Sequence, residues 1–343
     1  MGQIEGLLAW NQVKEILDGR HTPPERPSLL VGNGASIAVS QSFRYEKLRE
    51  HAELDEIATQ LFEEVGTSDF ELVLNRLGTS LMVNDVFGIE SDDIRDAYAQ
   101  IKSALIAAVH TVHIRGNEYY PNNALDEEFT SYARIYSTNY DMLLYWAMLQ
   151  LNSHRNENVV DLFRGRHFDR DHQFENHSTR LMYLHGALHL FENREKICFK
   201  RTGNGLSILD QLDDNGIARV HFVSEGNWIQ KMAKIRSSDY LSYCYEQLEE
   251  DHRDIVIFGH SLNADSDQHI LNALLKHPER IFAVSLHTDG RRAVEINDSM
   301  NEFRTKLSGL EANQIIFYDS STHPLGAPGQ NTPFGLLPAL DDQ

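Results

Sequence analysis

The sequence predicts an α/β fold, and three patterns lead to this prediction. Short, continuous apolar runs alternate with helical stretches in the last third of the chain, as buried parallel strands do in βαβ units. An early apolar run leads into a glycine turn followed by a helical pattern. Between that turn and the next strand signal, only helical patterns occur. We therefore expect a Rossmann-like, mostly parallel sheet with an all-helical insertion and a small irregular subdomain.

The first 27 residues are expected to form a helix and a linker. Residues 3–19 have apolar side chains at helical spacing, and Gly19 ends the pattern. The stretch HTPPERP, residues 21–27, contains the prolines of a linker and leads into the first strand. The Rossmann-like domain should then cover residues 28–320, with a C-terminal tail at 321–343.

A long helical segment, about residues 51–130, separates the first strand from the second. It contains no strand pattern, so we expect it to be an insertion between two strands of the sheet. Thr67–Glu71 has the side chains of a helix start, with a capping residue ahead of an acidic first turn. The expected helices cover about 36–50, just before the segment, and 53–65, 69–84 and 91–115 within it.

Strand signals resume after the insertion. The segment at about 152–215 is less regular and rich in Asn, Asp, Arg and His, so we expect loops and a small subdomain there. The last three strands are continuous apolar runs separated by helical patterns, which favours a parallel arrangement. The expected strands cover 133–138, 180–185, 196–200, 218–224, 254–259, 280–286 and 314–319.

Composition excludes several classes of protein. The chain has 31 Lys plus Arg against 51 Asp plus Glu, a formal net charge of −20, which repels phosphate backbones and disfavours direct nucleic-acid binding. No apolar run approaches the ~20 residues of a membrane span, so no membrane contact is expected. Two cysteines, Cys198 and Cys244, cannot form a disulfide framework or a four-cysteine zinc ribbon. We expect a cytoplasmic protein.

The 17 histidines do not form a recognisable metal motif in the sequence. His110 and His113 are one helical turn apart, and three others recur every fifth residue. Neither spacing matches a specific metal signature such as two histidines at i and i+4 with a glutamate between them. We therefore expect no metal site and no metal cofactor. The three regularly spaced histidines are His167, His172 and His177.

The glycine turn has part of the pattern of a nucleotide-binding turn. It reads Gly32-Asn33-Gly34-Ala35-Ser36, but Ile37 stands where the dinucleotide-binding fingerprint has its third glycine. The acidic residue expected about 20 positions later, after a second strand, is absent, because that region is helical. No P-loop sequence occurs. A tight structural turn with Ser36 capping the next helix is the alternative interpretation.

Polar side chains follow three other expected strands. Asn139 and Asp141 come after one strand, His185 follows the next, and Gly259 and Ser261 come after a third. Ligands of open parallel sheets bind at these carboxyl ends, so the four elements together favour a ligand site.

Each of these side chains also has a structural alternative. Asn139 could be a turn residue, Asp141 a helix N-cap, and His185 a histidine bonded to a nearby carbonyl. Asp265 or Asp267 could cap the helix that follows Ser261.

In this order the motifs Gly-x-Gly-Ala-Ser, Ser-x-Asn-x-Asp, Leu-His-Gly and Gly-x-Ser resemble the sirtuin family. Residues 223–248, followed by IVIFGHSLNADSDQHI at 255–270, are similar to a branch of bacterial sirtuin-like (SIR2-like) proteins without the zinc ribbon. The resemblance covers about residues 28–320 and is weakest in the helical insertion.

The resemblance implies that NAD is a substrate and is hydrolysed at the nicotinamide–ribose bond to nicotinamide and ADP-ribose. It implies that Asn139 lies near the nicotinamide ribose, that His185 is the general base and that Asp141 is the acidic partner of the asparagine motif. It places the diphosphate and ribose near the glycine turn, and the adenosine near Gly259 and Ser261. The substrate-binding residues implied are Gly32, Asn33, Gly34, Ala35, Ser36, Thr138, Gly259 and Ser261.

The resemblance also implies a biological setting. Bacterial sirtuin-like NAD hydrolases (NADases) without the ribbon act in antiviral defence, as homo-oligomers and beside a partner ATPase or sensor protein. The four cysteines of the deacylase ribbon and its Pro-Asp-Phe-Arg stretch are absent here, which argues against a zinc-dependent deacylase. Two alternatives stay open: a non-catalytic module that senses NAD or ADP-ribose, and an interaction protein that uses the helical segment as its contact surface.

Overall fold

In the part of the chain that the structure describes, the larger sheet has eight strands, and the buried, apolar sequences of its middle strands explain why they lie at the centre of the fold. A computed structural model describes residues 4–20, 25–114, 123–155, 159–171, 178–193, 195, 197–201, 220–223 and 227–326. Every residue of the SLLV and IVIF strands is buried, as expected for strands covered on both faces. The strands are β1 (Leu7–Leu8), β2 (Ser28–Val31), β3 (Arg134–Ser137), β4 (Val159–Val160), β7 (Thr179–Tyr183), β11 (Ile255–Phe258), β12 (Phe282–Leu286) and β13 (Ile315–Asp319).

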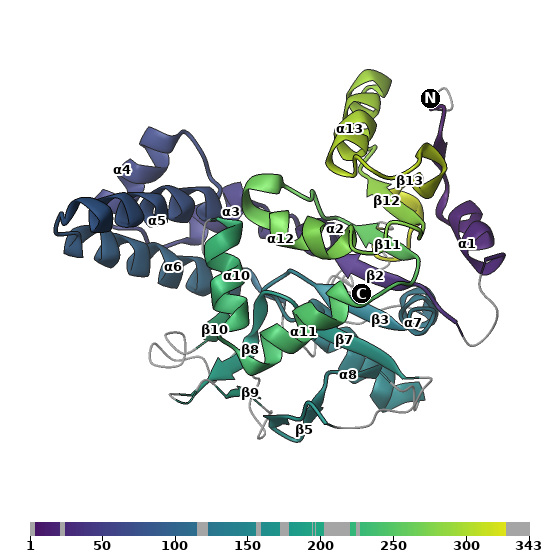
Figure 1. The fold of residues 1–343 in the computed structure, drawn as a ribbon, viewed down its shortest axis with the longest axis horizontal. Helices are drawn as coiled ribbons and strands as arrows, with labels where there is room; N and C mark the ends of the chain where they lie inside the picture. The colour runs from purple at the N-terminus through teal and green to yellow at the C-terminus, as the bar shows by residue number, and fades with distance from the viewer. Residues whose placement is uncertain are drawn as a thin grey trace, which may run out of the picture.

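The order of these strands is β1-β13-β12-β11-β2-β3-β7-β4, and every neighbouring pair is parallel (Figure 1). If β2 is counted as the first strand, the run β7-β3-β2-β11-β12-β13 has the order 3-2-1-4-5-6 of a doubly wound Rossmann sheet. The predicted α/β, Rossmann-like fold is thereby confirmed. The order reverses between β2 and β11, which is where such sheets bind ligands.

Helices surround the sheet and fill the segment between β2 and β3. The first is shorter than predicted, because Leu7 and Leu8 pair with β13 as an edge strand and the helix begins only at Trp10. The helices are α1 (Trp10–Asp18), α2 (Asn33–Val39), α3 (Tyr45–His51), α4 (Glu56–Val65), α5 (Phe70–Phe87), α6 (Asp92–Val112), α7 (Asn123–Thr130), α8 (Leu143–Arg155), α10 (Trp228–Arg236), α11 (Asp239–Glu249), α12 (Ala264–Leu274) and α13 (Ala293–Lys306).

The all-helical insertion is confirmed for the described residues between β2 and β3. Asp69 caps α5 by accepting hydrogen bonds from the backbone N–H groups of Glu71 and Leu72, so the predicted helix start is also confirmed. The single helix expected at 36–50 is wrong. Ser40 is extended, at φ −149° and ψ 128°, and splits it into α2, a 3₁₀ turn at Gln41–Phe43, and α3.

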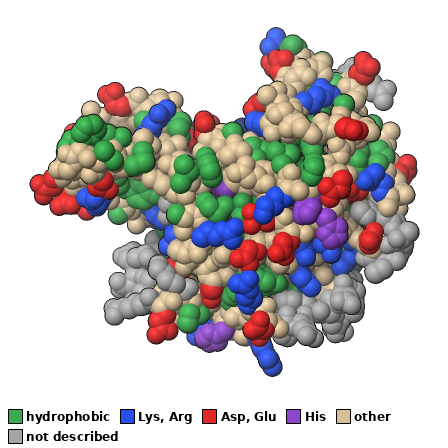
Figure 2. All heavy atoms as spheres, in the orientation of Figure 1, with side chains coloured by type: hydrophobic (Ala, Val, Ile, Leu, Met, Phe, Trp, Pro, Cys, Tyr) green, Lys and Arg blue, Asp and Glu red, His purple; other side chains and the backbone are tan. Residues whose placement is uncertain are grey.

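Helices α4, α5 and α6 form an arm that projects from the sheet, and we call these three helices the helical arm (Figure 1). Hydrophobic side chains gather at its free end (Figure 2). Val86 is 80% exposed and Phe87 73% exposed at the last turn of α5. Met82, one helical turn before Val86, and Ile89, two residues after Phe87, are exposed as well. Apolar side chains that gather on a surface mark a contact site more often than isolated ones do.

The segment expected to be irregular, 152–215, contributes strands to a second, antiparallel sheet. Its order is β10-β8-β9-β6-β5. The sequence did not predict β8, which begins at Gly186, directly after the strand expected at 180–185. Gly186 has φ +76°, and a Cβ there would lie 2.0 Å from the carbonyl oxygen of His221. The strands are β5 (Phe163–Arg164), β6 (His167–Phe168), β8 (Gly186–Glu192), β9 (Cys198–Lys200) and β10 (Val220–Phe222).

Parts of several predictions lie outside the described residues. These parts are the linker at 21–24, the insertion at 115–122, the irregular segment at 156–158, 172–177, 194, 196 and 202–215, the expected strand at 218–219 and 224, and the tail beyond residue 326. Among the described helices, none is both long enough and apolar enough to cross a membrane.

Candidate functional site

A cavity of about 260 Å³ lies at the carboxyl ends of β2, β3, β7 and β11, at the point where the strand order reverses. Four predicted elements meet there, as expected for ligand sites of parallel sheets. They are the glycine turn, the loop after β3 that contains Asn139 (the Asn139 loop), His185, and the loop after β11 that contains Gly259 (the Gly259 loop). Gly34, Ala35 and Ser36 lie in the same turn but do not line the cavity. The predicted site residues that line it are Gly32, Asn33, Thr138, Asn139, Asp141, His185, Gly259 and Ser261.

The glycines allow two backbone segments to touch. A Cβ on Gly34 would lie 2.6 Å from the Cα of Gly259, and a Cβ on Gly32 would lie 2.6 Å from the Gly259 carbonyl oxygen. Gly259 itself has φ +63°, a conformation that favours glycine. The N–H of Gly34 donates to the Gly259 carbonyl at 2.9 Å. That N–H is therefore already bonded within the protein, and the glycines serve the packing of the turn against β11.

Asn139 is held by the glycine turn. Its Nδ2 donates to the Ser36 hydroxyl at 2.8 Å and to the Gly32 carbonyl at 3.1 Å. Its Oδ1 is buried and has no hydrogen-bond partner among the described residues. An asparagine amide can accept as well as donate. The arrangement therefore fixes the orientation of the amide and leaves one acceptor for a ligand or water.

A chain of hydrogen bonds through Ser36 and Asp141 holds this amide in place. The Ser36 hydroxyl donates to Asp141 Oδ2, and the other carboxylate oxygen of Asp141 accepts from the backbone N–H of Leu143 at 2.9 Å. The alternative in which Ser36 caps a helix is wrong, because α2 begins at Asn33 with Gly32 at the N-cap position. The N-cap alternative for Asp141 agrees in part with the structure, since Leu143 is the first residue of α8.

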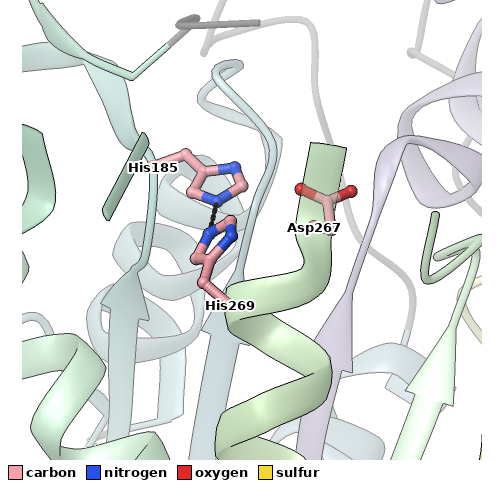
Figure 3. A group of neighbouring side chains, drawn as sticks. All are labelled: His185, Asp267 and His269. Carbon is pink, nitrogen blue, oxygen red and sulfur yellow. Dashed lines mark hydrogen bonds between the residues drawn. The ribbon is translucent and has the colours of Figure 1, made fainter. Parts of the chain in front are cut away.

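His185 faces another histidine (Figure 3). Its Nε2 lies 2.9 Å from Nε2 of His269, and both residues are buried. One ring must donate to the other, so the pair is a donor–acceptor contact between neutral rings. Burial lowers the pKa of His185 well below 6.5, and Lys231 adds to the effect. Burial likewise lowers the pKa of His269, to about 3. His185 is therefore a neutral base at pH 7. The expected structural alternative was a bond from His185 to a nearby carbonyl, but its Nε2 bonds to His269 instead.

A buried lysine lies at the same cavity. Lys231 Nζ is 2.7 Å from Glu71 Oε2 and 3.2 Å from Asp267 Oδ1, and its side chain is 1% exposed. Burial opposes the charge of Lys231, but Glu71 and Asp267 outweigh it and raise its pKa. Burial would also raise the pKa of Asp267, but Lys231 holds it below the usual range. The three side chains form one paired, charged group, which we call the lysine triad.

The first turn of α12 is distorted at Asp267, whose side chain belongs to the lysine triad. Asp267 has φ −128° and ψ 24°, and Asn263 caps the helix instead by accepting from the N–H of Asp265. The expectation that Asp265 or Asp267 is the cap is therefore wrong. Nothing in the sequence predicted that Glu71, Lys231 and His269 belong to the site. They lie in three separate helices, and no spacing along the chain relates them.

His185, Asp267 and His269 are also the described residues whose arrangement could hold a metal ion. One ligand atom from each lies within 4.8 Å of the others. Two histidines and a carboxylate are a known metal-binding set. However, Lys231 is ion-paired with Asp267 and would repel a divalent cation there. A metal-bound histidine usually donates from its second ring nitrogen, whereas Nδ1 of His269 has no partner among the described residues. The geometry thus fits an ion-paired lysine better than a metal.

The walls of the cavity are acidic. The lining includes four carboxylates and one lysine, Lys231, among the described residues. Burial, followed by Glu71, raises the pKa of Asp69 to about 6, a sign of crowded negative charge. Such a cavity favours a ligand group that is, or becomes, positively charged. The four carboxylates are Asp69, Glu71, Asp141 and Asp267.

The comparisons with known proteins identify a family but no activity. No curated protein matches the chain. A family model described as a domain of unknown function, DUF4917, matches residues 29–324. That range contains β2, β3, β7 and β11 almost entirely, and every predicted site residue. The chain therefore belongs to the DUF4917 family.

Proposed function

We propose that the protein hydrolyses NAD at the bond between nicotinamide and ribose, giving nicotinamide and ADP-ribose. The observation that carries the proposal is one cavity, at the ligand-binding position of a Rossmann sheet, that holds both an oriented asparagine amide and a neutral histidine. The order of the sequence motifs resembles that of sirtuins, which supports NAD as the ligand. No metal or further cofactor is needed for this reaction.

The acidic lining suits the charge that the reaction develops. Breaking the nicotinamide–ribose bond builds positive charge on the sugar, as in glycoside hydrolysis. Four acidic side chains line the cavity against one lysine among the described residues, and negative groups placed there stabilise that charge. Nicotinamide leaves as a neutral molecule, with the electron pair of the broken bond, so no general acid is required.

Asn139 and His185 have separate roles in this proposal. The free Oδ1 of Asn139 accepts a hydrogen bond from a ribose hydroxyl or from the attacking water. His185 takes a proton as the water oxygen bonds to the sugar carbon. If Nε2 of His185 donates to His269, the basic nitrogen of His185 is Nδ1. Asp141 acts indirectly. It accepts a hydrogen bond from the Ser36 hydroxyl, which in turn accepts one from the amide of Asn139.

The burial of His185 favours one alternative, a module that binds NAD or ADP-ribose without cleaving it. A histidine that is 2% exposed and already bonded to His269 can be a structural residue. Such a module would still need the glycine turn and the Gly259 loop. It would not need the neutral histidine and the free amide acceptor in the same cavity, and this is why we place hydrolysis first.

Incubation of the purified chain with NAD tests the proposal, with and without an acyl-lysine peptide. We expect nicotinamide release that does not depend on the peptide, because a zinc ribbon cannot be built from two cysteines. Release that requires the peptide would indicate a deacylase. Binding of NAD with no release in either condition would favour the sensing module.

Removal of divalent metal should leave NAD cleavage unchanged. The positive charge next to His185 and His269 is already supplied by Lys231, which is held by two carboxylates. The measurement is nicotinamide release before and after dialysis against a chelator, with zinc and manganese added back to separate samples. Loss of activity on dialysis and its recovery with one metal would contradict the expectation.

We further propose that the protein is a regulated effector in bacterial antiviral defence and that the helical arm mediates assembly, with a second copy or with a partner ATPase or sensor. The exposed apolar end of α5 supports a contact role for the arm.

The double change Val86→Ser and Phe87→Ser should therefore weaken assembly without changing the melting temperature, because both side chains are exposed. Light scattering measures the mass of the assembly, alone and with cellular partners. The matched control is Val294→Ser, an exposed apolar residue of α13, 54% accessible to solvent. If the double variant has the same mass as the wild type under conditions in which the wild type assembles, the helical arm does not mediate assembly through these residues.

A further inference from the structure

A second cavity, of about 550 Å³, lies at the amino ends of the parallel strands, opposite the candidate active site. Six arginines of the described residues line it, and five of them come from just before or at the start of a strand of the main sheet. Because parallel strands all begin at the same edge of the sheet, residues far apart in sequence meet there. The six are Arg20, Arg26, Arg134, Arg180, Arg253 and Arg280.

These arginines are crowded against one another. Arg134 and Arg180 are direct register partners on the neighbouring strands β3 and β7, and like charges in that position repel. The pKa of Arg180 is lowered, first by burial and then by Arg134. The pKa of Arg26 is lowered by burial and by Arg253. In isolation, such crowding is unfavourable.

Acidic side chains among the described residues offset part of this charge. Asp254 pairs with Arg20 at 2.9 Å, and Asp251, buried beneath the cavity, lies 2.9 Å from Arg253. The described lining contains six arginines and three carboxylates, so six minus three leaves +3, or +2 when Asp251 is included. A positive cavity stands out in a chain whose formal net charge is −20. The three lining carboxylates are Glu25, Asp254 and Glu279.

We propose that this cavity, which we call the arginine cavity, binds a small ligand that carries two or more phosphate groups. The guanidinium group forms paired hydrogen bonds with phosphate oxygens and stays charged at any physiological pH. The described hydrogen bonds of Arg280 go to backbone carbonyls and not to a carboxylate, so its charge adds to the positive potential of the cavity. The site does not depend on the proposed NAD hydrolysis, because it lies at the other end of the strands.

A small ligand fits better than a nucleic acid. The cavity volume is within the range of about 300–1,000 Å³ that small-molecule sites have. A long phosphate backbone would extend over a surface whose net charge is strongly negative and would be repelled there. The chemistry is shared by nucleoside polyphosphates and inorganic polyphosphates, which the experiment below separates.

Calorimetric titration of the full chain with inorganic tripolyphosphate tests the proposal, with orthophosphate, ATP and a 20-nucleotide DNA in parallel. We expect tripolyphosphate to bind, orthophosphate to bind much more weakly, and the affinity to fall as salt is added. Binding of ATP but not tripolyphosphate would identify a nucleotide ligand. Binding of DNA alone, or no binding heat with either polyphosphate, would overturn the proposal.

Two sets of variants assign the binding to the arginine cavity. The double change Arg180→Gln and Arg253→Gln should weaken polyphosphate binding by about tenfold or more, since charged hydrogen bonds are lost. Arg95→Gln, an exposed and ion-paired arginine of the helical arm, should bind as the wild type does. If the double variant does not fold, Arg180→Lys serves instead, because it keeps the charge and removes the paired donors. His185→Gln should retain polyphosphate binding. Equal affinity in the wild type and the cavity variants would contradict the assignment.

Discussion

Replacement of His185 by Gln, or of Asn139 by Ala, is expected to lower NAD turnover by roughly 10²-fold or more, the scale of a positioned acid–base group. His185→Gln keeps a side chain that can bond to His269 but removes the basic ring nitrogen. Asn139→Ala removes the free acceptor and the link between the Ser36 hydroxyl and the Gly32 carbonyl. NAD binding should survive in at least one of the two variants, because the glycine turn and the Gly259 loop are unchanged.

The control for His185 is His189→Gln. His189 is also fully buried, and its ring nitrogens have no partner among the described residues, but it does not line the cavity. Nicotinamide release and thermal unfolding should be measured on the same samples. If His185→Gln only lowers stability, by about 1–3 kcal/mol, and its folded fraction turns over NAD normally, His185 is a structural residue.

Replacement of Lys231 by Met is expected to cost about 3–5 kcal/mol of the free energy of unfolding, the usual effect of breaking a buried ion pair by removing one partner. Glu71 and Asp267 would keep their charges near the cavity with no cation between them. Urea unfolding followed by circular dichroism measures the loss.

Lys234→Met is the matched control for this change. Lys234 lies one turn further along the same helix, α10, is 28% exposed, and is 3.7 Å from Glu192. Its loss should cost no more than about 1 kcal/mol, as for other partly exposed pairs. Addition of Glu71→Gln and Asp267→Asn to Lys231→Met should recover part of the stability, because the uncompensated charges are gone. A cost below about 1 kcal/mol for Lys231→Met would show that the lysine triad is not a buried ion pair.

The parts of the fold that depend on local pattern were predictable from the sequence. The strands β11, β12 and β13 are short, mostly apolar runs, and such runs are typical of buried parallel strands; β11 is buried throughout, β12 almost so, and β13 in part. The carboxyl-end rule then places Asn139 and His185 at the same edge of the sheet, and the structure has both in one cavity.

The parts that depend on tertiary contact were not predictable in this way. Ser36 has the composition of a helix cap, yet Gly32 takes that position and the Ser36 hydroxyl bonds to Asp141, 105 residues away. Lys231 is brought to the cavity by a helix whose sequence gives no sign of a site. Its partners are 160 and 36 residues distant in the chain. The glycines of the turn were expected to admit a phosphate, whereas Gly34 is packed against Gly259.

Cleavage of NAD in the cavity is tested most directly by the time course of both products when NAD is incubated with the purified full chain. Chromatography separates nicotinamide and ADP-ribose. We predict equal amounts of the two products, formed at a rate proportional to the concentration of the wild-type protein and reduced by roughly 10²-fold or more in Asn139→Ala. Wild-type protein that binds NAD and releases no nicotinamide, even with its cellular partners present, would contradict the account and identify the cavity as a binding site alone.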